Sequence, residues 1–437
     1  MGSPYAGHLE ALRERYAAKR PRSAALFQRA AGVLPGGSTR SVLDLQPFPF
    51  RVATASGARL VDVDGHEYLD LLGDFTAGLL GHDPGPVAAA VTARLADGWS
   101  LGATHTDEIR LAELVCARFP SIEQVRFTNS GTEANLMALQ LARHATGRDR
   151  IVVFDGAYHG GLLYFGRGGE ALRAPFAFDV LPYNDPDAFG AMLADHGDAV
   201  AAVLVEPMMG AGGCIPAAPG FLEALRAGCD RHGALLVFDE VMTSRMSTGG
   251  AQQRLGVLPD LTTLGKYLAG GMTFGAFGGG AHLMAAFDPA RGGTLTHGGT
   301  FNNNVVSMAG GVAALGEVLT GSALDEVFER GERLRPEVAA LVADLGMAVT
   351  GWGSMMAFHA VRRPVRSPAD AAAGDPVLVE VVFHELLDRG VYIAPRGFVA
   401  LSLAVTDDDL AVFTAALGEA VQSVASSTEQ RPPAFDA

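Results

Sequence analysis

Short apolar runs separated by helical patterns are the feature that most limits how this chain can fold. Examples are IVVFDG at residues 151–156, AVAAVLVEP at 199–207 and ALLVFDE at 234–240. Continuously apolar runs of this length are typical of strands buried on both faces of a parallel sheet. Helices are expected between them, and GFLEALRAGCDRHG at 220–233 has helical spacing and stops at a glycine. The pattern predicts an α/β fold over residues 65–320.

The two ends of the chain have a different texture and predict a second, smaller domain. The 437 residues are enough for two or three packing units. Residues 1–64 should contribute a segment to the smaller domain and the active site, beginning with one amphipathic helix over 5–31. Residues 321–437 should form the smaller α/β domain, with a flexible crossing at 362–376 and a frayed tail over 426–437.

Composition and charge exclude several classes of function. A formal net charge of −15 argues against a nucleic-acid partner, because phosphate backbones are bound by clustered lysines and arginines. The cysteines, Cys116, Cys214 and Cys229, are too few and scattered for a disulfide framework or a zinc site, which favours a reducing cytoplasm and no metal. The amino terminus is charged where a signal peptide is apolar, and no run of about 18 apolar residues occurs, so neither export nor a membrane span is expected.

Two charged residues follow strand-like runs, where ligands bind in an open parallel sheet. Asp239 ends the run LLVFD, and Lys266 follows DLTTLG. Alone, the aspartate could be a helix cap or structural ion pair, and the lysine a solvated surface charge. Together they are informative, because a partly desolvated lysine amine can form an imine with an aldehyde cofactor. A carboxylate can meanwhile keep the pyridine nitrogen of such a cofactor protonated.

The stretch FTNSGTEAN at residues 127–135 predicts a phosphate site. It places hydroxyls and a glycine at the amino terminus of a helix, where backbone N–H groups are free to point outward. Ser130, Gly131 and Thr132 are the candidate phosphate ligands. The same residues could also serve only as a helix cap.

Two further segments are candidates for the same site. Tyr158 and His159, in FDGAYHGG, follow another strand-like run, where an aromatic ring could stack on a flat cofactor or simply pack in the core. The segment HGGTFNNN at 297–304 is polar and irregular, and by itself it could be a loop with Asx turns.

Six motifs in a fixed order resemble the class III, fold-type I pyridoxal-phosphate aminotransferases. They are SGTEA, FDGAYHGG, VLVEP, ALLVFDEV, PDLTTLGK and GGTFNNN. The resemblance covers roughly residues 30–405. It implies the fold of that family, in which a large, mostly parallel sheet domain with helices on both faces binds the cofactor and a smaller α/β domain packs beside it.

Within the family the chain is similar to the glutamate-1-semialdehyde aminomutase branch, and inside it to aminotransferases for β-amino acids of the β-phenylalanine type. This narrower resemblance rests on GGSTRSVL at 36–43, DEVMTSR at 239–245, HGGTFNNN at 297–304 and APRGFVALSL at 394–403.

The resemblance implies a role for each residue around the ring of pyridoxal phosphate. Lys266 would form the imine with the cofactor, and Asp239 would pair with the pyridine nitrogen. Val241 would pack beneath the ring, and Tyr158 or His159 would stack above it.

The resemblance also implies how the cofactor's phosphate is held. Ser130, Gly131 and Thr132 would bind it from one subunit. Thr300 would complete the phosphate site from the neighbouring subunit, which implies a homodimer with active sites at the subunit interface.

Two positions depart from the family pattern. Met242 stands near the expected position of the cofactor's phenolic oxygen, where many class III enzymes carry a glutamine. Ala211, in MMGAGGC, replaces a glutamate that ω-amino acid aminotransferases use to neutralise a switching arginine. Both departures argue against a simple ornithine- or GABA-type substrate.

Arg40 and Arg396 are the candidates for binding substrate carboxylates. Arg40 lies in a glycine- and serine-rich turn, and Arg396 lies in PRGF before a strand-like run. A planar guanidinium can hold a carboxylate with two hydrogen bonds, although each arginine could be an ordinary surface residue. The resemblance suggests Arg40 for the carboxylate of a β-amino acid and Arg396 for the keto acceptor, a division that the sequence leaves open.

The resulting hypothesis is an aminotransferase that moves an amino group from a β-amino acid to a keto acid such as 2-oxoglutarate or pyruvate. Lys266 would be the general base and acid, and Asp239 would maintain the electron sink. Glutamate-1-semialdehyde 2,1-aminomutase is the alternative within the same chemistry. A non-catalytic regulatory protein that binds the cofactor is disfavoured, because the first 60 residues lack a basic helix-turn-helix segment. No G-x-G-x-x-G follows a strand, which disfavours a nicotinamide dehydrogenase.

Overall fold

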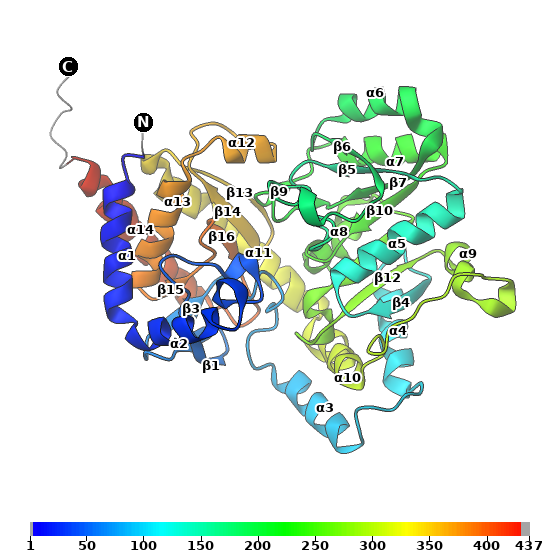
Figure 1. The fold of residues 1–437 in the computed structure, drawn as a ribbon, viewed down its shortest axis with the longest axis horizontal. Coiled ribbons are helices and arrows are strands. Elements are labelled where there is room, and N and C mark those ends of the chain that lie inside the picture. Colours follow the sequence, from blue (N-terminus) through cyan, green and yellow to red (C-terminus); the bar gives the residue numbers. More distant parts are fainter. Residues whose placement is uncertain (1–2, 430–437) are drawn as a thin grey trace.

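The computed structural model describes residues 3–429, which form two bodies that lie side by side (Figure 1). One body holds a seven-stranded sheet made by the middle of the chain, drawn in cyan to green. The other combines the blue amino-terminal elements with the orange and red carboxyl-terminal ones. Segments from the two ends of the chain are therefore packed together.

The seven-stranded sheet is mostly parallel, which confirms the predicted fold class. Its strands in spatial order are β4 (Gln124–Thr128), β12 (Gly275–Gly279), β11 (Leu261–Gly265), β10 (Leu235–Asp239), β7 (Val200–Val205), β5 (Arg150–Phe154) and β6 (Ala177–Leu181). β12 is antiparallel to β11 and β4, whereas the pairs from β11 to β6 are parallel. Every residue of β7 is buried, as expected for a strand covered on both faces.

Helices pack against this sheet and connect its strands. They are α3 (Gly85–Ala96), α4 (Thr106–Arg118), α5 (Gly131–Thr146), α6 (Pro186–His196), α7 (Phe221–His232), α8 (Gly250–Leu255), α9 (Ala281–Met284) and α10 (Val305–Ala313). The helix predicted over 220–233 is confirmed as α7, which ends where Gly233 adopts a left-handed φ of 66°.

The smaller body contains two small sheets covered by helices. One sheet has the order β1 (Val52–Ser56), β2 (Arg59–Asp62), β3 (Glu67–Asp70) and β15 (Val391–Tyr392); the other has β13 (Ala348–Trp352), β14 (Met355–His359) and β16 (Phe398–Ala400). The helices are α1 (Ala6–Lys19), α2 (Pro21–Ala31), α11 (Gly321–Val342), α12 (Pro368–Ala372), α13 (Pro376–Asp388) and α14 (Asp407–Glu429). The parallel pairing of β3 with β15 joins the two ends of the chain in one sheet.

Several local features differ from the expectations above. The single helix expected over 5–31 is wrong: α1 and α2 meet at Arg20, which has non-helical φ and ψ before Pro21 because a proline disfavours helical backbone in the preceding residue. The stretch 362–376 contains α12, which begins with a capping box at Ser367. The boundary placed at residue 65 falls between β2 and β3 of one sheet.

Only part of the frayed tail predicted over 426–437 lies within the described residues. Residues 426–429 continue α14, and residues 430–437 lie outside the part of the chain that the structure describes.

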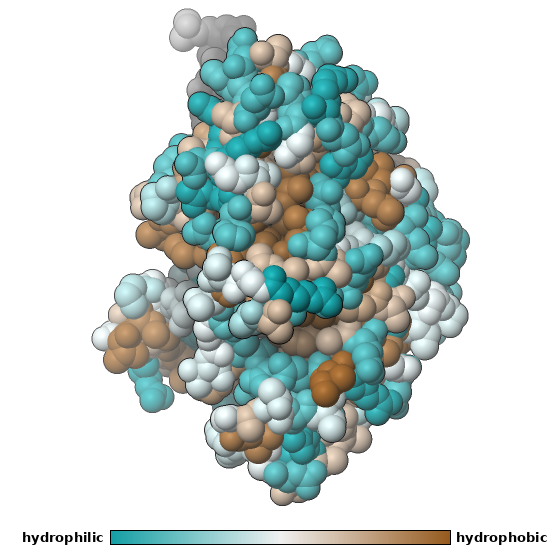
Figure 2. All heavy atoms as spheres, turned by 90° about the vertical axis from the view of Figure 1, so that its right-hand side faces the viewer, coloured by the Kyte–Doolittle hydropathy of each residue, from teal (hydrophilic) through white to brown (hydrophobic). Residues whose placement is uncertain are grey.

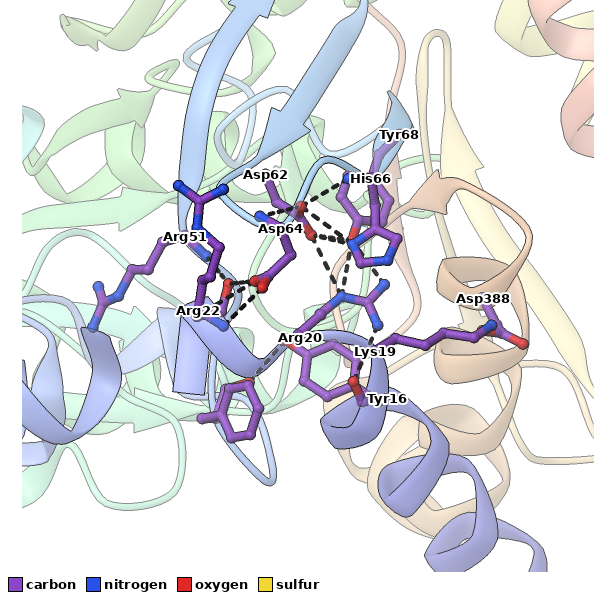
Figure 3. Close-up of polar contacts among 12 residues, drawn as sticks. Tyr16, Lys19, Arg20, Arg22, Arg51, Asp62, Asp64, His66, Tyr68 and Asp388 are labelled. Atoms are coloured by element: carbon purple, nitrogen blue, oxygen red, sulfur yellow. Dashed lines mark hydrogen bonds and ion pairs between the residues drawn. The ribbon is translucent and has the colours of Figure 1, made fainter. Parts of the chain in front are cut away.

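A buried polar network fixes the corner between α1 and α2 against the β2–β3 hairpin (Figure 3). Arg20, 2% exposed, donates from Nε and Nη2 to the Tyr68 hydroxyl at 2.9 and 2.7 Å. Tyr68 in turn donates to Asp62 Oδ2 at 2.7 Å, and Arg20 Nε lies 3.5 Å from the same oxygen. Burial alone would raise the pKa of Asp62, but hydrogen bonds from Tyr68 and His66 hold it below its usual value.

Figure 2 shows the molecule from the side of the seven-stranded sheet, where apolar patches are separated by hydrophilic side chains. Within residues 3–429, no single helix is long and apolar enough to cross a membrane. The helical segments Val305–Val318 and Gly321–Leu345, which are bent by 77° relative to each other, are together long and apolar enough to do so by length and composition alone.

We expect the substitution Arg20→Met to lower the free energy of unfolding by about 3–5 kcal/mol, because the Asp62 carboxylate loses its buried guanidinium partner and keeps only the partly exposed His66. Urea denaturation followed by circular dichroism measures the change. Asp149→Asn is the control, since it breaks the pair of Arg143 with a largely exposed aspartate and should cost less than about 1 kcal/mol. Equal effects of the two substitutions would contradict the structural importance of this network.

Candidate active site

Lys266 lies at the carboxyl end of β11, where the chain turns into a short 3₁₀ helix. Its φ of 57° is in the left-handed region, which a residue with a side chain seldom adopts and which is enriched at active sites. Its amine donates to the carbonyl oxygen of Phe75 at 2.6 Å. Phe75 lies in a segment, Asp74–Thr76, whose three residues also have positive φ. Strained backbone therefore holds both partners of this hydrogen bond.

The environment of Lys266 makes its amine a usable nucleophile. Burial lowers its pKa to about 8, and Arg396 acts in the same direction. Asp239, Asp74 and Glu206 oppose the shift, since each carboxylate favours the charged amine. A substantial part of the amine is therefore neutral near pH 8, as addition to an aldehyde requires.

Asp239 is the last residue of β10 and is 4% exposed. Its Oδ2 lies 2.8 Å from both His159 Nδ1 and Asn135 Nδ2, and its Oδ1 accepts the backbone N–H of Val241 at 3.0 Å. These donors compensate for the burial of the carboxylate. One acceptor position remains on Oδ1, because a carboxylate oxygen has two lone pairs.

The structure places the two rings of the Tyr158–His159 pair differently. His159 is fully buried behind Asp239, so its ring is engaged with the carboxylate and the expectation that it stacks on a cofactor does not fit. Tyr158 is 47% exposed, and its ring lies 5.6 Å from that of Tyr164. Its backbone N–H donates to Glu206 Oε1 at 3.1 Å. Tyr158 is therefore the ring of the two that remains available for stacking.

The Ser130–Thr132 turn can serve both as a helix cap and as a phosphate site, the two roles considered for it. Ser130 caps α5, since its hydroxyl accepts the N–H of Glu133 at 3.2 Å, and the first N–H groups of the helix have no intrahelical acceptor. A Cβ placed on Gly131 would lie 2.8 Å from Val241 Cγ2. Val241 thus packs directly against the turn, and only a glycine fits between them. The structure brings the predicted phosphate turn and the predicted ring contact together.

Arg40 and Arg396 meet at one aromatic ring. Their guanidinium carbons lie 5.6 and 5.3 Å from the centre of the Phe75 ring. Arg40 Nη1 also donates to Asp74 Oδ1 at 2.6 Å. Burial lowers the pKa of Arg396, while Tyr158 is among the groups that raise it. Both candidate carboxylate ligands therefore lie beside the residue whose carbonyl oxygen binds Lys266.

Met242 lies at the edge of the same site. A Cβ on Gly210 would overlap the Met242 sulfur, so this side chain covers the segment that leads to Ala211. Met242 packs on an apolar cluster that includes Phe75 and Phe398. An apolar thioether therefore occupies the position where many relatives are expected to have an amide.

Thr300, which is predicted to bind the phosphate, does not reach the site within a single chain. It is exposed, and none of the contacts among the described residues joins it to the Ser130–Thr132 turn. Its neighbour Asn302 does reach that region, since Asn302 Oδ1 accepts from Asn129 Nδ2 at 3.0 Å. The loop thus lies beside the turn while Thr300 faces outward.

Sequence reasoning missed three residues of this site. Glu206 directly follows β7, much as Asp239 ends β10, so the rule that selected Asp239 would also have selected Glu206. Burial raises the pKa of Glu206 to about 7. Asn135 is fully buried on α5 and gives no local signal of its contact with Asp239. Phe75 is recognisable only once the fold brings Lys266 and the two arginines to it.

These residues fit pyridoxal phosphate. The site offers a partly neutral lysine amine, a buried carboxylate with a free acceptor position, and a helix amino terminus that holds anions. Gly131 keeps the turn open where a side chain would fill it. The fold and the site together define a pyridoxal-phosphate enzyme of the α/β transferase type.

Comparison with known proteins gives the family. The chain matches the model of the class III aminotransferases over residues 43–421. It is 51% identical over 406 residues to the beta-phenylalanine transaminase of Variovorax paradoxus, covering 92% of this chain and 93% of that protein. The solved structure of β-phenylalanine aminotransferase from this organism superposes with a TM-score of 0.93 at 50% identity, covering 96% of this chain and 97% of the other.

Two other relatives are more distant. Glutamate-1-semialdehyde 2,1-aminomutase of Sorangium cellulosum is 40% identical over 423 residues, covering 92% of this chain and 96% of that protein. A solved transaminase with PLP bound superposes with a TM-score of 0.85 at 35% identity, covering 94% of this chain and 99% of the other. The chain belongs to the class III aminotransferases, and its cofactor is pyridoxal phosphate.

We expect borohydride reduction of the holoenzyme to attach the cofactor permanently to Lys266, because it is the amine that the fold places beside Asp239. Peptide mapping by mass spectrometry identifies the modified residue. Lys266→Ala should abolish turnover and labelling while phosphate contacts retain part of the cofactor. A label on any other lysine would refute the assignment.

We also expect the rate at which apoprotein captures pyridoxal phosphate to rise with pH through a midpoint near 8, the pKa of the Lys266 amine. Below this value the amine is protonated and cannot add to the aldehyde; above it the amine is neutral. Stopped-flow absorbance at several pH values measures the midpoint. A midpoint near 10.5, the usual lysine value, would show that burial does not shift this group.

Proposed function

We propose that this protein transfers an amino group from a β-amino acid to a keto acid such as 2-oxoglutarate or pyruvate. The observation that carries the proposal is the arrangement of Arg40 and Arg396 around Phe75, next to the Lys266 amine. The similarity to a β-phenylalanine transaminase supports a substrate of this class.

Two arginines are useful because two different carboxylates must use the site in turn. In a β-amino acid the carboxylate is one carbon further from the amine-bearing carbon than in an α-keto acid. A single guanidinium cannot suit both distances while the reacting carbon stays beside Lys266. We assign the β-amino acid carboxylate to Arg40 and the acceptor carboxylate to Arg396.

Arg40 is already oriented for this role. Its contact with Asp74 uses Nη1, whereas Nε and Nη2 have no acceptor among residues 3–429. The parallel N–H groups of Nε and Nη2 form the edge that binds a carboxylate with two hydrogen bonds. Asp74 thus holds the guanidinium and leaves this edge free.

The proposed steps use residues at the carboxyl edge of the sheet. When bound, pyridoxal phosphate supplies an aldehyde that carries the amino group and a ring that accepts an electron pair. Lys266 then moves a proton to and from the amine-bearing carbon as general base and acid. Asp239 would keep the ring nitrogen protonated, Val241 and Tyr158 would pack against the ring, and Ser130–Thr132 would bind the phosphate.

A homodimer is part of the proposal, with Thr300 of the partner subunit completing the phosphate site. The surface near the exposed loop carries three large exposed apolar residues, Trp99, Ile109 and Phe301, which are 63%, 60% and 62% exposed. Large exposed apolar side chains of this kind are found at protein interfaces. A cytoplasmic location also belongs to the proposal, on the basis of the few scattered cysteines.

Single-turnover experiments separate the two halves of the proposed reaction. Arg40→Ala should slow amino-group transfer from β-phenylalanine to the cofactor roughly ten- to a hundredfold, because a charge-assisted pair of hydrogen bonds is lost. Arg396→Ala should instead slow the return of the amino group to 2-oxoglutarate. Cofactor absorbance reports both rates.

The wild-type enzyme provides the reference for these rates. Unchanged rates of both variants in both directions would show that these arginines do not bind the carboxylates. A wild-type enzyme that ignores β-amino acids and rearranges glutamate-1-semialdehyde would instead be an aminomutase, and the proposed function would be wrong.

A further inference from the structure

The Asn135 amide makes hydrogen bonds to Asp239 and to two further residues beside it. It lies on α5 and is fully buried. Its Nδ2 is 2.8 Å from Asp239 Oδ2 and 3.0 Å from the carbonyl oxygen of His159. Its Oδ1 is 2.7 Å from the Thr263 hydroxyl. One amide therefore connects α5, the turn after β5, the end of β10 and the middle of β11.

Chemistry fixes the orientation of this amide. The Asp239 carboxylate and the His159 carbonyl oxygen only accept hydrogen bonds, so the NH₂ group of Asn135 must face them. Oδ1 then faces Thr263, whose hydroxyl must donate to it. β10 and β11 pair with Asp239 opposite Thr263, so the threonine that fixes the amide is the direct cross-strand neighbour of the aspartate.

This arrangement determines which oxygen of Asp239 stays available. Oδ2 accepts from Asn135 and from His159 and has no lone pair left. Oδ1 accepts only the N–H of Val241 among the described residues and keeps one lone pair. Without the amide, the carboxylate could rotate about its Cβ–Cγ bond and exchange the two oxygens.

We infer that Asn135, held by Thr263, is a positioning residue that fixes the Asp239 carboxylate so that Oδ1 faces the ring nitrogen of the cofactor. The inference rests on the role proposed for Asp239. The second N–H of Asn135 helps to keep Oδ2 occupied, since it donates to the backbone carbonyl oxygen of His159, and the His159 ring is the other donor to Oδ2.

A second buried amide, Gln252 on α8, contacts the same sheet and provides a control. Gln252 Nε2 lies 3.2 Å from Glu240 Oε1 and 3.1 Å from Thr262 Oγ1. Glu240 and Thr262 are the chain neighbours of Asp239 and Thr263, and adjacent residues of a strand point to opposite faces of a sheet. Like Asn135, Gln252 joins a buried carboxylate to a threonine of β11, although its NH₂ group donates to both and its contacts lie away from Lys266. Loss of either amide should cost stability, but only loss of Asn135 should affect the cofactor.

The test uses holoenzyme loaded with pyridoxal phosphate that carries ¹⁵N in its ring. The ¹⁵N chemical shift reports whether the ring nitrogen is protonated, independently of turnover. Asn135→Leu should move this signal toward the unprotonated value and lower kcat roughly ten- to a hundredfold, because one charge-assisted hydrogen bond to Asp239 is lost. Gln252→Leu should leave both quantities at their wild-type values.

Thr263 provides a milder variant in case Asn135→Leu does not fold. Thr263→Val keeps the shape of the side chain and removes the donor to Asn135 Oδ1, so it should shift the ¹⁵N signal in the same direction by a smaller amount. Thr263→Ser restores the hydroxyl and should restore the signal. Wild-type ¹⁵N signals in both Asn135→Leu and Thr263→Val would overturn the inference.

Asp239→Asn distinguishes this inference from the proposed function. If Asp239→Asn moves the ¹⁵N signal and Asn135→Leu does not, Asp239 pairs with the ring but Asn135 does not position it. If Asp239→Asn leaves the signal unchanged, the pairing itself is wrong, and the inference falls with it.

Discussion

The burial of Asp239 is the constraint on which the arrangement of this site depends. A carboxylate at the end of an apolar strand is tolerable only if donors replace the water it has lost. Three N–H groups do so, from Asn135, His159 and Val241, which lie on three different segments of the chain. Satisfying one charge thus fixes α5, the turn after β5 and the turn after β10 relative to each other. These segments also carry the phosphate turn, the Tyr158 ring and the residue that packs against Gly131.

Strained backbone supplies the second half of the site. Lys266 and the segment Asp74–Thr76 have positive φ, a conformation that costs free energy in residues with side chains. The cost is offset by a packed surrounding that includes Phe75 and Phe398. The result is a lysine amine aimed at a backbone carbonyl rather than at solvent or at a carboxylate that would keep it charged. Burial lowers the pKa of a lysine held in this way to about 8. A pKa close to neutral pH suits a group proposed to give and take protons.

The sequence predicts the fold and the chemistry of the site better than its packing. The mostly parallel sheet and α7 follow from apolar runs and a terminal glycine, because these signals are local. Asp239 and Lys266 are predictable because ligands gather at the ends of parallel strands. The break at Arg20 was missed although Pro21 signals it, since the helical spacing of charged and apolar residues continues across it.

Other contacts have no local signal at all. Asn135 looks like any polar residue on a helix, and its importance comes from a carboxylate more than a hundred residues further on. The stacking role considered for His159 failed for a similar reason, because only the fold shows that its ring is already bound to Asp239. The position of Phe75 in the site likewise has no local signal, because it arises where three distant segments meet around this residue.

The residues proposed to hold the cofactor and those proposed to bind substrate carboxylates come from different parts of the chain. Asp239, Lys266 and the Ser130–Thr132 turn belong to the seven-stranded sheet and its connections. Arg40 and Arg396 instead belong to the body formed by the two ends of the chain, and they lie against Phe75, whose carbonyl oxygen accepts a hydrogen bond from Lys266. A substitution in either arginine segment changes what the site can hold without removing a donor from Asp239 or moving Lys266. On this proposal, substrate choice can change around Phe75 while the residues proposed to hold the cofactor stay the same.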